Sequence, residues 1–531
     1  MNQSTCYIRG SVLTQQRETP RAEAVVTRGR RILFVGTTDD ALAAAGAGAT
    51  VVDLGGRCML PGFIDGHTHF VQGGMHLQGV NLRRCRSAEE FAATLKAHVE
   101  NHRGSWITGG DWDQESWLTR RKPARQMVDS FSADTPIFVQ RFDGHMGLAN
   151  GAALRVAGIT ASTPDPQGGV IERDPVTGEP TGILKDAAIP LVTDRVPPPS
   201  AGEIRNAVRI ALREAAWNGV TSIHDITLPE HLPVFEAMAA EGELTVHIYS
   251  RLPIATYREL IDRGVTAGAG DGRVSLGSLK AFSDGSLGSD TAWFFEPYSH
   301  DSSLTGLAMD IVTSGQLREW ALEADRHRLQ LSIHSIGDRA NDAILRIFED
   351  IVKTNPLWDR RLRIEHAQHV RPGDFARFAS LGVVVSAQPY HCIDDGVWAE
   401  GRIGAERART TYAFRSFVDA GVHLCFGSDW TVAPLEPIRG IYAAVTRRTL
   451  DGARPGGWVP EQRLTVEQAL RCYTVEGAYA SFEERLRGSI TPGKLADLVV
   501  LSRDPASVPP GQLCDITVDM TIADGQTVYC R

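Results

Sequence analysis

Two histidines spaced for metal binding end the first apolar run of the chain, LPGFIDGHTHF at residues 60–70. If this run forms a strand, His67 and His69 lie two positions apart and their imidazoles project from the same face. Neutral imidazole nitrogens are good ligands for Zn²⁺. An isolated H-x-H pair is weak evidence, because such pairs also occur on solvated surfaces, so a metal site needs further ligands elsewhere in the chain.

Four further metal-competent residues end other apolar runs in the same way, namely Lys280, His334, His366 and Asp429. Several imidazoles with one carboxylate suit zinc or a similar ion, and Asp429 is also able to take a proton from a metal-bound water. Lysine is normally cationic and a poor ligand. A carbamate formed from Lys280 and carbon dioxide would instead be an anionic group that bridges two metals. The alternative for Lys280 is an ion pair with Asp284.

These residues require elements that bring distant strand ends together. Helical segments, such as residues 201–219 and 313–328, precede later apolar runs, as crossovers between parallel strands require. Eight such strands predict an α/β fold, a (β/α)8 TIM-like barrel with its catalytic groups at the C-terminal mouth. An open doubly wound sheet is the alternative. The eight apolar runs are LPGFIDGHTHF, GVTSIHDI, LTVHIYSRL, VSLGSLKAFSDG, LQLSIHSIG, RLRIEHAQH, GVVVSAQP and VHLCFGSDW.

Short β-like runs separated by turns occupy both ends of the chain. Neither end is long enough to bury much surface alone, so we expect residues 1–58 and 486–531 to form one small β-sandwich together. The barrel then occupies residues 59–485. The long connection after its first strand predicts an inserted subdomain at about residues 71–200, and long connections of this kind usually carry function.

Composition restricts the partners of the protein. The 531 residues carry 64 acidic and 55 basic side chains without a long run of either sign, which disfavours nucleic acid and anionic membranes as partners. No apolar run reaches the length of a membrane span, and the first residues lack the pattern of a signal peptide, so the sequence predicts a cytoplasmic protein. The eight cysteines include no C-x-x-C pair, which indicates reduced thiols. A homodimer is the default expectation.

The ordered motifs resemble those of the amidohydrolase superfamily, and most closely its YtcJ-like branch, which includes N-substituted formamide deformylases. The segments that carry this resemblance are LPGFIDGHTHF, LKAFSDGSLGS, IHSIGDRAND, RIEHAQH, SAQP and GSDW. The terminal segments VVDLGGRCMLPGFID and GSITPGKLADLVVL resemble the split β-sandwich that flanks the barrel in that family. The resemblance covers nearly the whole chain.

The resemblance implies a role for each candidate ligand. His67 and His69 would bind the more buried metal, Lys280 would be the carboxylated bridge, and His334 and His366 would bind the second metal. The implied cofactor is zinc, with one or two ions, and a single-metal site remains feasible without carboxylation of Lys280. In the implied mechanism a metal-held hydroxide attacks a polarised carbonyl carbon, and Asp429 acts as ligand and as general base and acid.

Several further residues are candidates for the substrate pocket. His145, by resemblance, would reach over the site to hold the substrate carbonyl, and a structural role is favoured for His224. His391 and His369 have the positions of loop residues rather than of ligands. Asp290 departs from the family pattern, which usually has a basic residue there, so substrate preference is not carried over. The expected substrate-binding residues are Trp112, Asp113, His224, Gln388 and Trp430.

The sequence therefore predicts a metal-dependent hydrolase that cleaves a non-peptide C–N bond of a small amide, such as an N-acyl or N-formyl amine. The alternative within enzymes is a mononuclear deaminase, or a hydrolase of cyclic amides or carbamates, on the same scaffold. A non-catalytic regulatory protein with this fold is a third reading, since a fold does not determine a function. The complete set of ligands disfavours it, because a binding protein has no need of Asp429 as a proton acceptor.

Overall fold

The computed structural model describes residues 4–101, 106–114, 117–119, 121–141, 146–270 and 272–531. The chain forms two compact units. The larger unit comprises residues 1–70 and 212–531, and the smaller unit comprises residues 71–211. Because the smaller unit begins and ends within the span of the larger one, it is an insertion in the chain. His145 lies outside the described residues.

Eight parallel strands form the barrel of the larger unit, and each of the eight predicted runs supplies one of them. A parallel bridge between Thr68 and Trp430 joins the first strand to the segment after the last, which excludes the open sheet. The prediction of a TIM-like barrel is therefore confirmed. In sheet order the strands are β8 (Phe63–Thr68), β15 (Val220–Ile226), β16 (His247–Pro253), β18 (Val274–Phe282), β19 (Gln330–Ser335), β20 (Arg363–His366), β21 (Val384–Ala387) and β22 (His423–Phe426).

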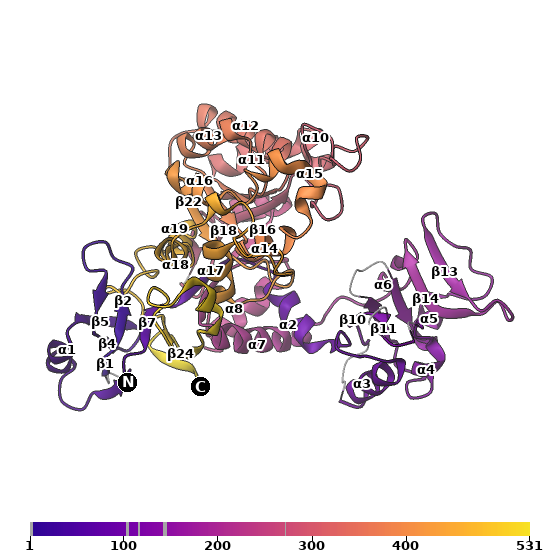
Figure 1. The fold of residues 1–531 in the computed structure, drawn as a ribbon, viewed down its shortest axis with the longest axis horizontal. Helices are drawn as coiled ribbons and strands as arrows, with labels where there is room; N and C mark the ends of the chain where they lie inside the picture. Colours follow the sequence, from indigo (N-terminus) through magenta and orange to yellow (C-terminus); the bar gives the residue numbers. More distant parts are fainter. Residues whose placement is uncertain (1–3, 102–105, 115–116, 120, 142–145, 271) are drawn as a thin grey trace. The chain divides into compact units, whose positions relative to one another are not determined.

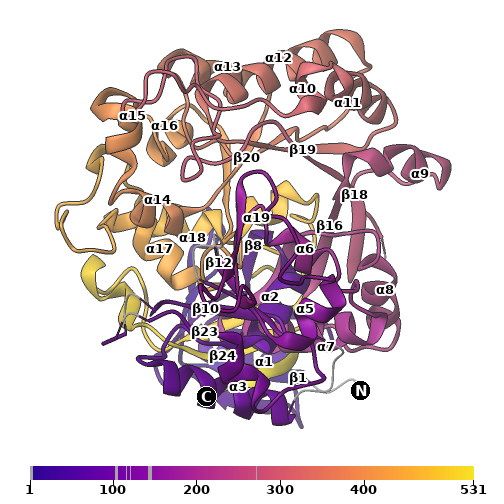
Figure 2. The ribbon, with the colours of Figure 1, turned by 90° about the vertical axis from the view of Figure 1, so that its right-hand side faces the viewer.

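Helices connect these strands and lie outside them (Figure 2). The helix α12 (Asp338–Thr354) illustrates why the helices pack against the strands. Its buried Ile344, Leu345 and Phe348 recur at helical spacing on the side that faces the sheet. The others in this unit are α8 (Leu232–Ala240), α9 (Tyr257–Asp262), α10 (Asp310–Thr313), α11 (Gln316–Arg326), α13 (Phe375–Ser380), α14 (Pro389–Asp395), α15 (Ala399–Ala408), α16 (Phe414–Asp419), α17 (Pro437–Thr446), α18 (Val466–Cys472) and α19 (Val475–Ala480).

Strands from both ends of the chain form two further sheets, which Figure 1 shows beside one another. Strands β7 and β23 pair antiparallel, so the N-terminal and C-terminal segments share one sheet. Side chains of both segments, including Tyr7, Val25, Leu498 and Ile522, pack into a common core. The first sheet has the order β5 (Arg31–Gly36), β4 (Ala24–Arg28), β1 (Ser4–Ile8), β6 (Thr50–Asp53), with helix α1 (Thr38–Ala45); the second has the order β25 (Gln526–Cys530), β24 (Val518–Ala523), β23 (Leu498–Leu501), β7 (Cys58–Pro61), β2 (Ser11–Leu13), β3 (Arg21–Ala22).

The inserted unit contains a sheet of its own, built around a core that includes Phe91, Leu95 and Trp112. The helix α7 (Ala201–Trp217) leads from this unit back to the barrel. The sheet order is β13 (Gly169–Arg173), β14 (Pro180–Asp186), β12 (Met146–Ala149), β11 (Phe138–Arg141), β10 (Gly109–Trp112), β9 (Val80–Asn81), and the helices are α2 (Phe70–Gln78), α3 (Ala88–Asn101), α4 (Arg125–Asp129), α5 (Gly151–Ala157) and α6 (Pro190–Thr193).

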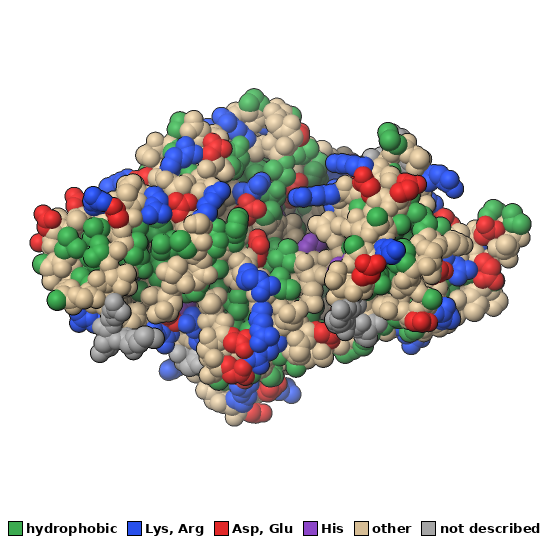
Figure 3. Space-filling view, turned by 90° about the horizontal axis from the view of Figure 1, so that it is seen from below, with side chains coloured by type: hydrophobic (Ala, Val, Ile, Leu, Met, Phe, Trp, Pro, Cys, Tyr) green, Lys and Arg blue, Asp and Glu red, His purple; other side chains and the backbone are tan. Residues whose placement is uncertain are grey.

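Three general properties bear on the expectations about partners. Acidic and basic side chains are interspersed on the face drawn in Figure 3. Within the described ranges, no helix has both the length and the apolar character needed to cross a membrane. All eight cysteines are free thiols, as their spacing predicted.

Candidate metal centre

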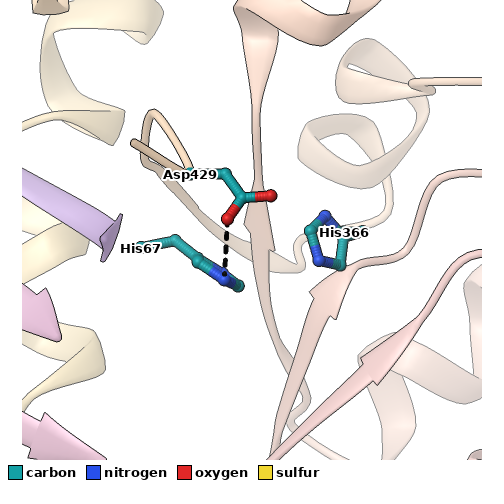
Figure 4. A group of neighbouring side chains, drawn as sticks. All are labelled: His67, His366 and Asp429. Atoms are coloured by element: carbon teal, nitrogen blue, oxygen red, sulfur yellow. Dashed lines mark ion pairs between the residues drawn. The ribbon is translucent and has the colours of Figure 1, made fainter. Parts of the chain in front are cut away.

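Three predicted ligands from three distant segments meet inside the barrel mouth. His67 is the penultimate residue of β8, His366 ends β20, and Asp429 follows β22; Figure 4 shows their side chains facing one another. Their ligand atoms all lie within 4.8 Å of one another, and all three residues are buried. The Nε2 atom of His67 is 3.5 Å from Oδ1 of Asp429. This spacing suits a metal ion held between the three groups.

The other three predicted ligands line the same cavity, which has a volume of about 400 Å³. The Nε2 atom of His69 lies 3.3 Å from Oδ1 of Asp429. The ring centroids of His334 and His366 are 4.5 Å apart. Lys280 is almost fully buried at the end of β18. The structure thus brings all six predicted ligands around one cavity, while the individual roles assigned to them stay predictions.

Backbone conformation places two of these residues. His366 has φ 70° and Asp429 has φ 58°, a left-handed region that residues other than glycine rarely occupy. His366 directly follows the inward-facing Glu365, so a regular strand would turn it to the opposite face, and the positive φ breaks that alternation. Backbone strain of this kind is concentrated at functional sites. The N–H of Asp429 donates to the carbonyl oxygen of His67 at 2.7 Å, which ties β22 to β8.

Glu365 orients His67, and sequence reasoning missed it. Its Oε2 atom accepts a hydrogen bond from Nδ1 of His67 at 2.5 Å, which leaves Nε2 of the ring to face Asp429. Arg251 pairs with Oε1 of Glu365 at 2.8 Å, and Arg363 also pairs with it. Despite burial, these two arginines hold the pKa of Glu365 well below its usual range. A carboxylate behind a metal-binding histidine typically fixes its tautomer and strengthens it as a ligand.

The protonation states fit a metal centre. Burial and the neighbouring charge of Lys280 lower the pKa of His67 to about 3 and that of His334 to about 4, so both rings are neutral near pH 7. Burial also lowers the pKa of His366 well below its usual range. For Asp429 burial opposes ionisation, but the contacts with His67, His69 and His366 prevail and hold its pKa well below the usual range. Neutral imidazoles with one carboxylate are the donor set that zinc prefers.

Two buried nitrogens of the predicted ligands lack a hydrogen-bond partner among the described residues. They are Nζ of Lys280 and Nδ1 of His366. Buried polar atoms are rarely left unpaired in proteins, so such atoms point to a missing ion or water. This observation, together with the donor set, supports the fit of the site to a bound metal.

The alternative ion pair between Lys280 and Asp284 is wrong. The Asp284 carboxylate accepts N–H groups of Trp293, Ile336 and Gly337 at 2.8–3.0 Å. Burial then raises the pKa of Asp284 to about 7, so this carboxyl is a weak partner for a cation. No ion pair joins it to Lys280 among the described residues. Burial lowers the pKa of Lys280 to about 7, which leaves part of the amine unprotonated at neutral pH.

Three of the residues predicted to contact substrate belong to the inserted unit. The structure corrects the prediction for Trp112 and does not test those for Asp113 and His145. Trp112 is completely buried in the core of that unit, and its Nε1–H donates to the carbonyl oxygen of Val139 at 3.0 Å. It therefore has no free surface for substrate. Asp113 lies 3.4 Å from Nη2 of Arg141. Its contact with substrate stays a prediction, as does that of His145.

Two further residues predicted to contact substrate, His224 and Gln388, are not among the residues that line the cavity. His224 is 0% exposed, and its Nδ1 accepts a hydrogen bond from Arg363 at 2.8 Å. This agrees with the structural reading of His224 and not with substrate contact. Gln388 is also 0% exposed and donates to the carbonyl oxygen of Ser386 at 3.2 Å. Trp430 is nearly buried against Phe70, with ring centroids 6.0 Å apart, and its contact with substrate stays a prediction.

The cavity has further lining residues that sequence reasoning assigned elsewhere or did not consider. His391, read as a loop residue, is one of them, and Gln368 is another. Asp290, the departure from the family pattern, forms ion pairs with Arg402 and, at 3.4 Å, with His300. The negative charge of Asp290, which stands where the family usually has a basic residue, is therefore balanced within the barrel.

Comparisons with known proteins agree with this site. The sequence profile of the amidohydrolase family matches residues 50–529. The chain therefore belongs to the amidohydrolase family and is a hydrolase.

Three similar proteins indicate the branch of the amidohydrolase family to which the chain belongs. The putative amidohydrolase YtcJ of Bacillus subtilis is 30% identical over 98% of both chains. The N-substituted formamide deformylase of Arthrobacter pascens is 29% identical over 99% of this chain and 98% of its own. The protein LONG AFTER FAR-RED 3 of Arabidopsis thaliana is 37% identical over 93% of this chain and 86% of its own. The chain is thus a YtcJ-like amidohydrolase, as its motifs indicated.

A solved structure supports the same fold. The crystal structure of a metal-dependent hydrolase from Pyrococcus furiosus superposes with a TM-score of 0.80 at 27% identity. The match covers 95% of this chain and 100% of that one.

Proposed function

We propose that this protein hydrolyses the non-peptide C–N bond of a small N-acyl or N-formyl amine. The observation that carries the proposal is the cluster of His67, His366 and Asp429 in one cavity with the unpaired amine of Lys280. The formamide deformylase, similar over nearly its whole length, supports an amide as the substrate class.

Zinc is the proposed cofactor, with one or two ions. His67 and His69 would hold one ion, His334 and His366 the other, and Lys280 and Asp429 would complete the set. When bound, zinc supplies a Lewis acid that activates water and polarises a carbonyl group.

Lys280 is suited to carboxylation by carbon dioxide. Its pKa of about 7 leaves part of the amine unprotonated at neutral pH, so its nitrogen lone pair is available. The amine nitrogen attacks the carbon of carbon dioxide, a C–N bond forms, and a proton leaves to solvent. The product is a carbamate anion, whose oxygens would be available as metal ligands.

Asp429 is the proposed general base and acid. Its low pKa keeps it ionised at neutral pH, and Nε2 atoms of His67 and His69 lie within 3.5 Å of its Oδ1. The carboxylate accepts a proton from the attacking water and then gives it to the leaving nitrogen, which departs as an amine. The cavity of about 400 Å³ limits the substrate to a small molecule, and its apolar side chains Phe282, Leu287 and Trp398 suit an aryl or alkyl group.

Elemental analysis tests the proposal before any substrate is known. The parent protein is compared with Lys280→Ala and with Lys185→Ala, a control that removes a lysine paired with Glu172 in the inserted unit. About two zinc ions in the parent and in the control, and fewer in Lys280→Ala, would support a lysine-bridged site. One ion in all three proteins would favour the single-metal alternative. Absence of metal after supplementation would contradict the proposal.

Turnover is then measured with N-benzylformamide, by following the release of formate and benzylamine. Hydrolysis that is lost on chelation and restored by zinc is expected. Release of ammonia from amino-substituted rings without formamide hydrolysis would favour the deaminase alternative.

A further inference from the structure

The helix α14 carries two polar residues into the cavity that the proposed mechanism does not use. It begins directly after β21, at the same end of the barrel as the candidate metal centre. His391 and Asp395 lie four positions apart on it, so they share one face of the helix. Both residues line the cavity.

His391 has a buried nitrogen without a partner. No described residue forms a hydrogen bond with its Nε2 atom, although that atom is shielded from solvent. A buried nitrogen left unpaired is energetically unfavourable. A ligand in the cavity that accepts a hydrogen bond would remove this cost, so the nitrogen is a specific point of attachment for substrate.

The surroundings of His391 make it a donor. The carboxylates of Asp395 and Asp429 line the same cavity as His391. Asp395 is itself held in place, because it accepts hydrogen bonds from the hydroxyl of Tyr412 at 2.6 Å and from Nε2 of Gln368 at 3.0 Å. Carboxylates accept and do not donate, so an imidazole that shares a cavity with two of them is suited to present an N–H to a third group.

We propose that Nε2–H of His391 donates a hydrogen bond to the carbonyl oxygen of the scissile bond, where negative charge develops during attack. Asp395 is a positioning residue that acts through His391. The inference deepens the proposed function and rests on it. In this inference His391, a residue of the barrel, makes the contact with the substrate carbonyl that the family resemblance implies for His145.

The first test compares His391→Ala and His391→Gln with the parent on two formamides. N-benzylformamide has a poor leaving group, and formanilide has a better one. Loss of one oxyanion donor typically costs about 10²–10³ in kcat. We expect kcat of His391→Ala to fall by about this factor on both substrates, with KM changed less than about threefold. His423→Gln, which alters a histidine at the start of β22 and the opposite end of the barrel, is the matched control.

Three results would overturn the assignment. A loss confined to N-benzylformamide would make His391 a proton donor to the leaving nitrogen. A fall in zinc content of the variant would make it a metal ligand. A change in kcat smaller than threefold would leave it no role in the reaction.

Asp395→Asn tests the positioning role. It should lower kcat about tenfold with KM little changed, and it should cause no further loss in a protein that already carries His391→Ala. An additive loss in the double variant would contradict an effect through His391.

A binding measurement separates this inference from the proposed function. N-benzyl methylphosphonamidate mimics the tetrahedral form of the substrate and requires no turnover. By calorimetry, its Kd should rise at least tenfold in His391→Ala and remain unchanged in His423→Gln. If the parent hydrolyses no amide but this contrast holds, only the proposed substrate is wrong. Equal Kd values, or no binding to the parent, would overturn the role of His391.

Discussion

Two buried histidine–aspartate clusters lie at opposite ends of the same barrel. His67, His366 and Asp429 meet at the C-terminal ends of the strands. The second cluster lies at the other end, where β16 begins. Its members are His247, Asp497 and Asp524, and the two aspartates adjoin strands β23 and β24 of the terminal sheet. In each cluster the ligand atoms lie within 4.8 Å of one another. Residue types and spacing alone therefore do not distinguish the two.

The arginines around each cluster distinguish them. At the second cluster Arg273 pairs with Asp524, Arg30 pairs with it at 2.9 Å, and Arg487 lies 3.8 Å from Asp497. Burial and Arg487 oppose a proton on His247, but the two aspartates prevail and raise its pKa. Its Nδ1–H donates to the carbonyl oxygen of Gly272 at 2.6 Å, and Nε2 faces Asp497 at 3.2 Å. Nδ1 is thus bonded, and the raised pKa favours a proton on Nε2, which disfavours metal binding there.

At the candidate metal centre the arginines bind a different carboxylate. Arg251 and Arg363 pair with Glu365, which in turn accepts from His67. The positive charges of the two arginines are therefore balanced by Glu365, which precedes His366 in the chain, and the imidazoles of the candidate ligands stay neutral. The same side-chain types form a candidate metal centre or a charge network according to which carboxylate the arginines bind.

The largest expected effect is the loss of activity in Asp429→Asn. Removal of a group that serves as ligand and as general base should lower kcat by about 10³–10⁴, or about 4–5 kcal/mol. The matched change at the other end, Asp497→Asn, should alter kcat less than threefold. Formamide hydrolysis at saturating substrate measures both. Similar losses in the two variants would remove the distinction between the clusters.

Glu365→Gln should give the next largest effect. It leaves the charges of Arg251 and Arg363 buried without their carboxylate, and breaking a buried pair typically destabilises a protein by about 3 kcal/mol or more. Zinc affinity should also fall, by about 10–100-fold, because His67 loses its charged partner. Urea unfolding and competition with a chelator measure the two effects.

Glu400→Gln is the control for this change, because it removes a carboxylate from an exposed ion pair with Arg454 and should change the free energy of unfolding by less than about 1 kcal/mol. Unchanged zinc affinity in a folded Glu365→Gln protein would contradict the positioning role of Glu365.

His247→Gln should lower the free energy of unfolding by about 2 kcal/mol, since hydrogen bonds to charged groups contribute about 1.5–3 kcal/mol. Its zinc content and kcat should match those of the parent, because His247 lies at the end of the barrel away from the cavity. Urea unfolding, elemental analysis and turnover test this. A loss of zinc in this variant would show that the second cluster also binds metal.

The sequence predicted the eight strands and the six residues that meet around the cavity, because those residues end apolar runs and strand ends meet in a barrel. Glu365 and the second cluster were missed for a physical reason. Glu365 and His67 are 298 positions apart, and only their hydrogen bond reveals the partnership. Trp112 was misassigned because a motif position does not reveal burial, and this side chain lies in the core of the inserted unit. His391 was read as a loop residue, although it lies in α14, because the course of the chain after β21 is not encoded in a periodic pattern.

The smallest effect is a difference in pH dependence between the two ends, measured by urea unfolding from pH 5 to 9 with a chelator present. His334, with its pKa lowered to about 4, stays neutral in the folded protein, whereas its unfolded counterpart takes up a proton below about pH 6.5. Its contribution to stability is therefore lost as the pH falls. His247 has a raised pKa, so its contribution is complete below about pH 6.5 and is lost as the pH rises through the folded pKa.

His334→Asn should accordingly reduce the loss of stability on the acidic side by about 2 kcal/mol. The destabilisation caused by His247→Gln should instead be greatest at acidic pH and shrink at alkaline pH. If the effect on the free energy of unfolding changed with pH in the same direction in both variants, the arginines would not be the cause of the difference in charge between the two clusters.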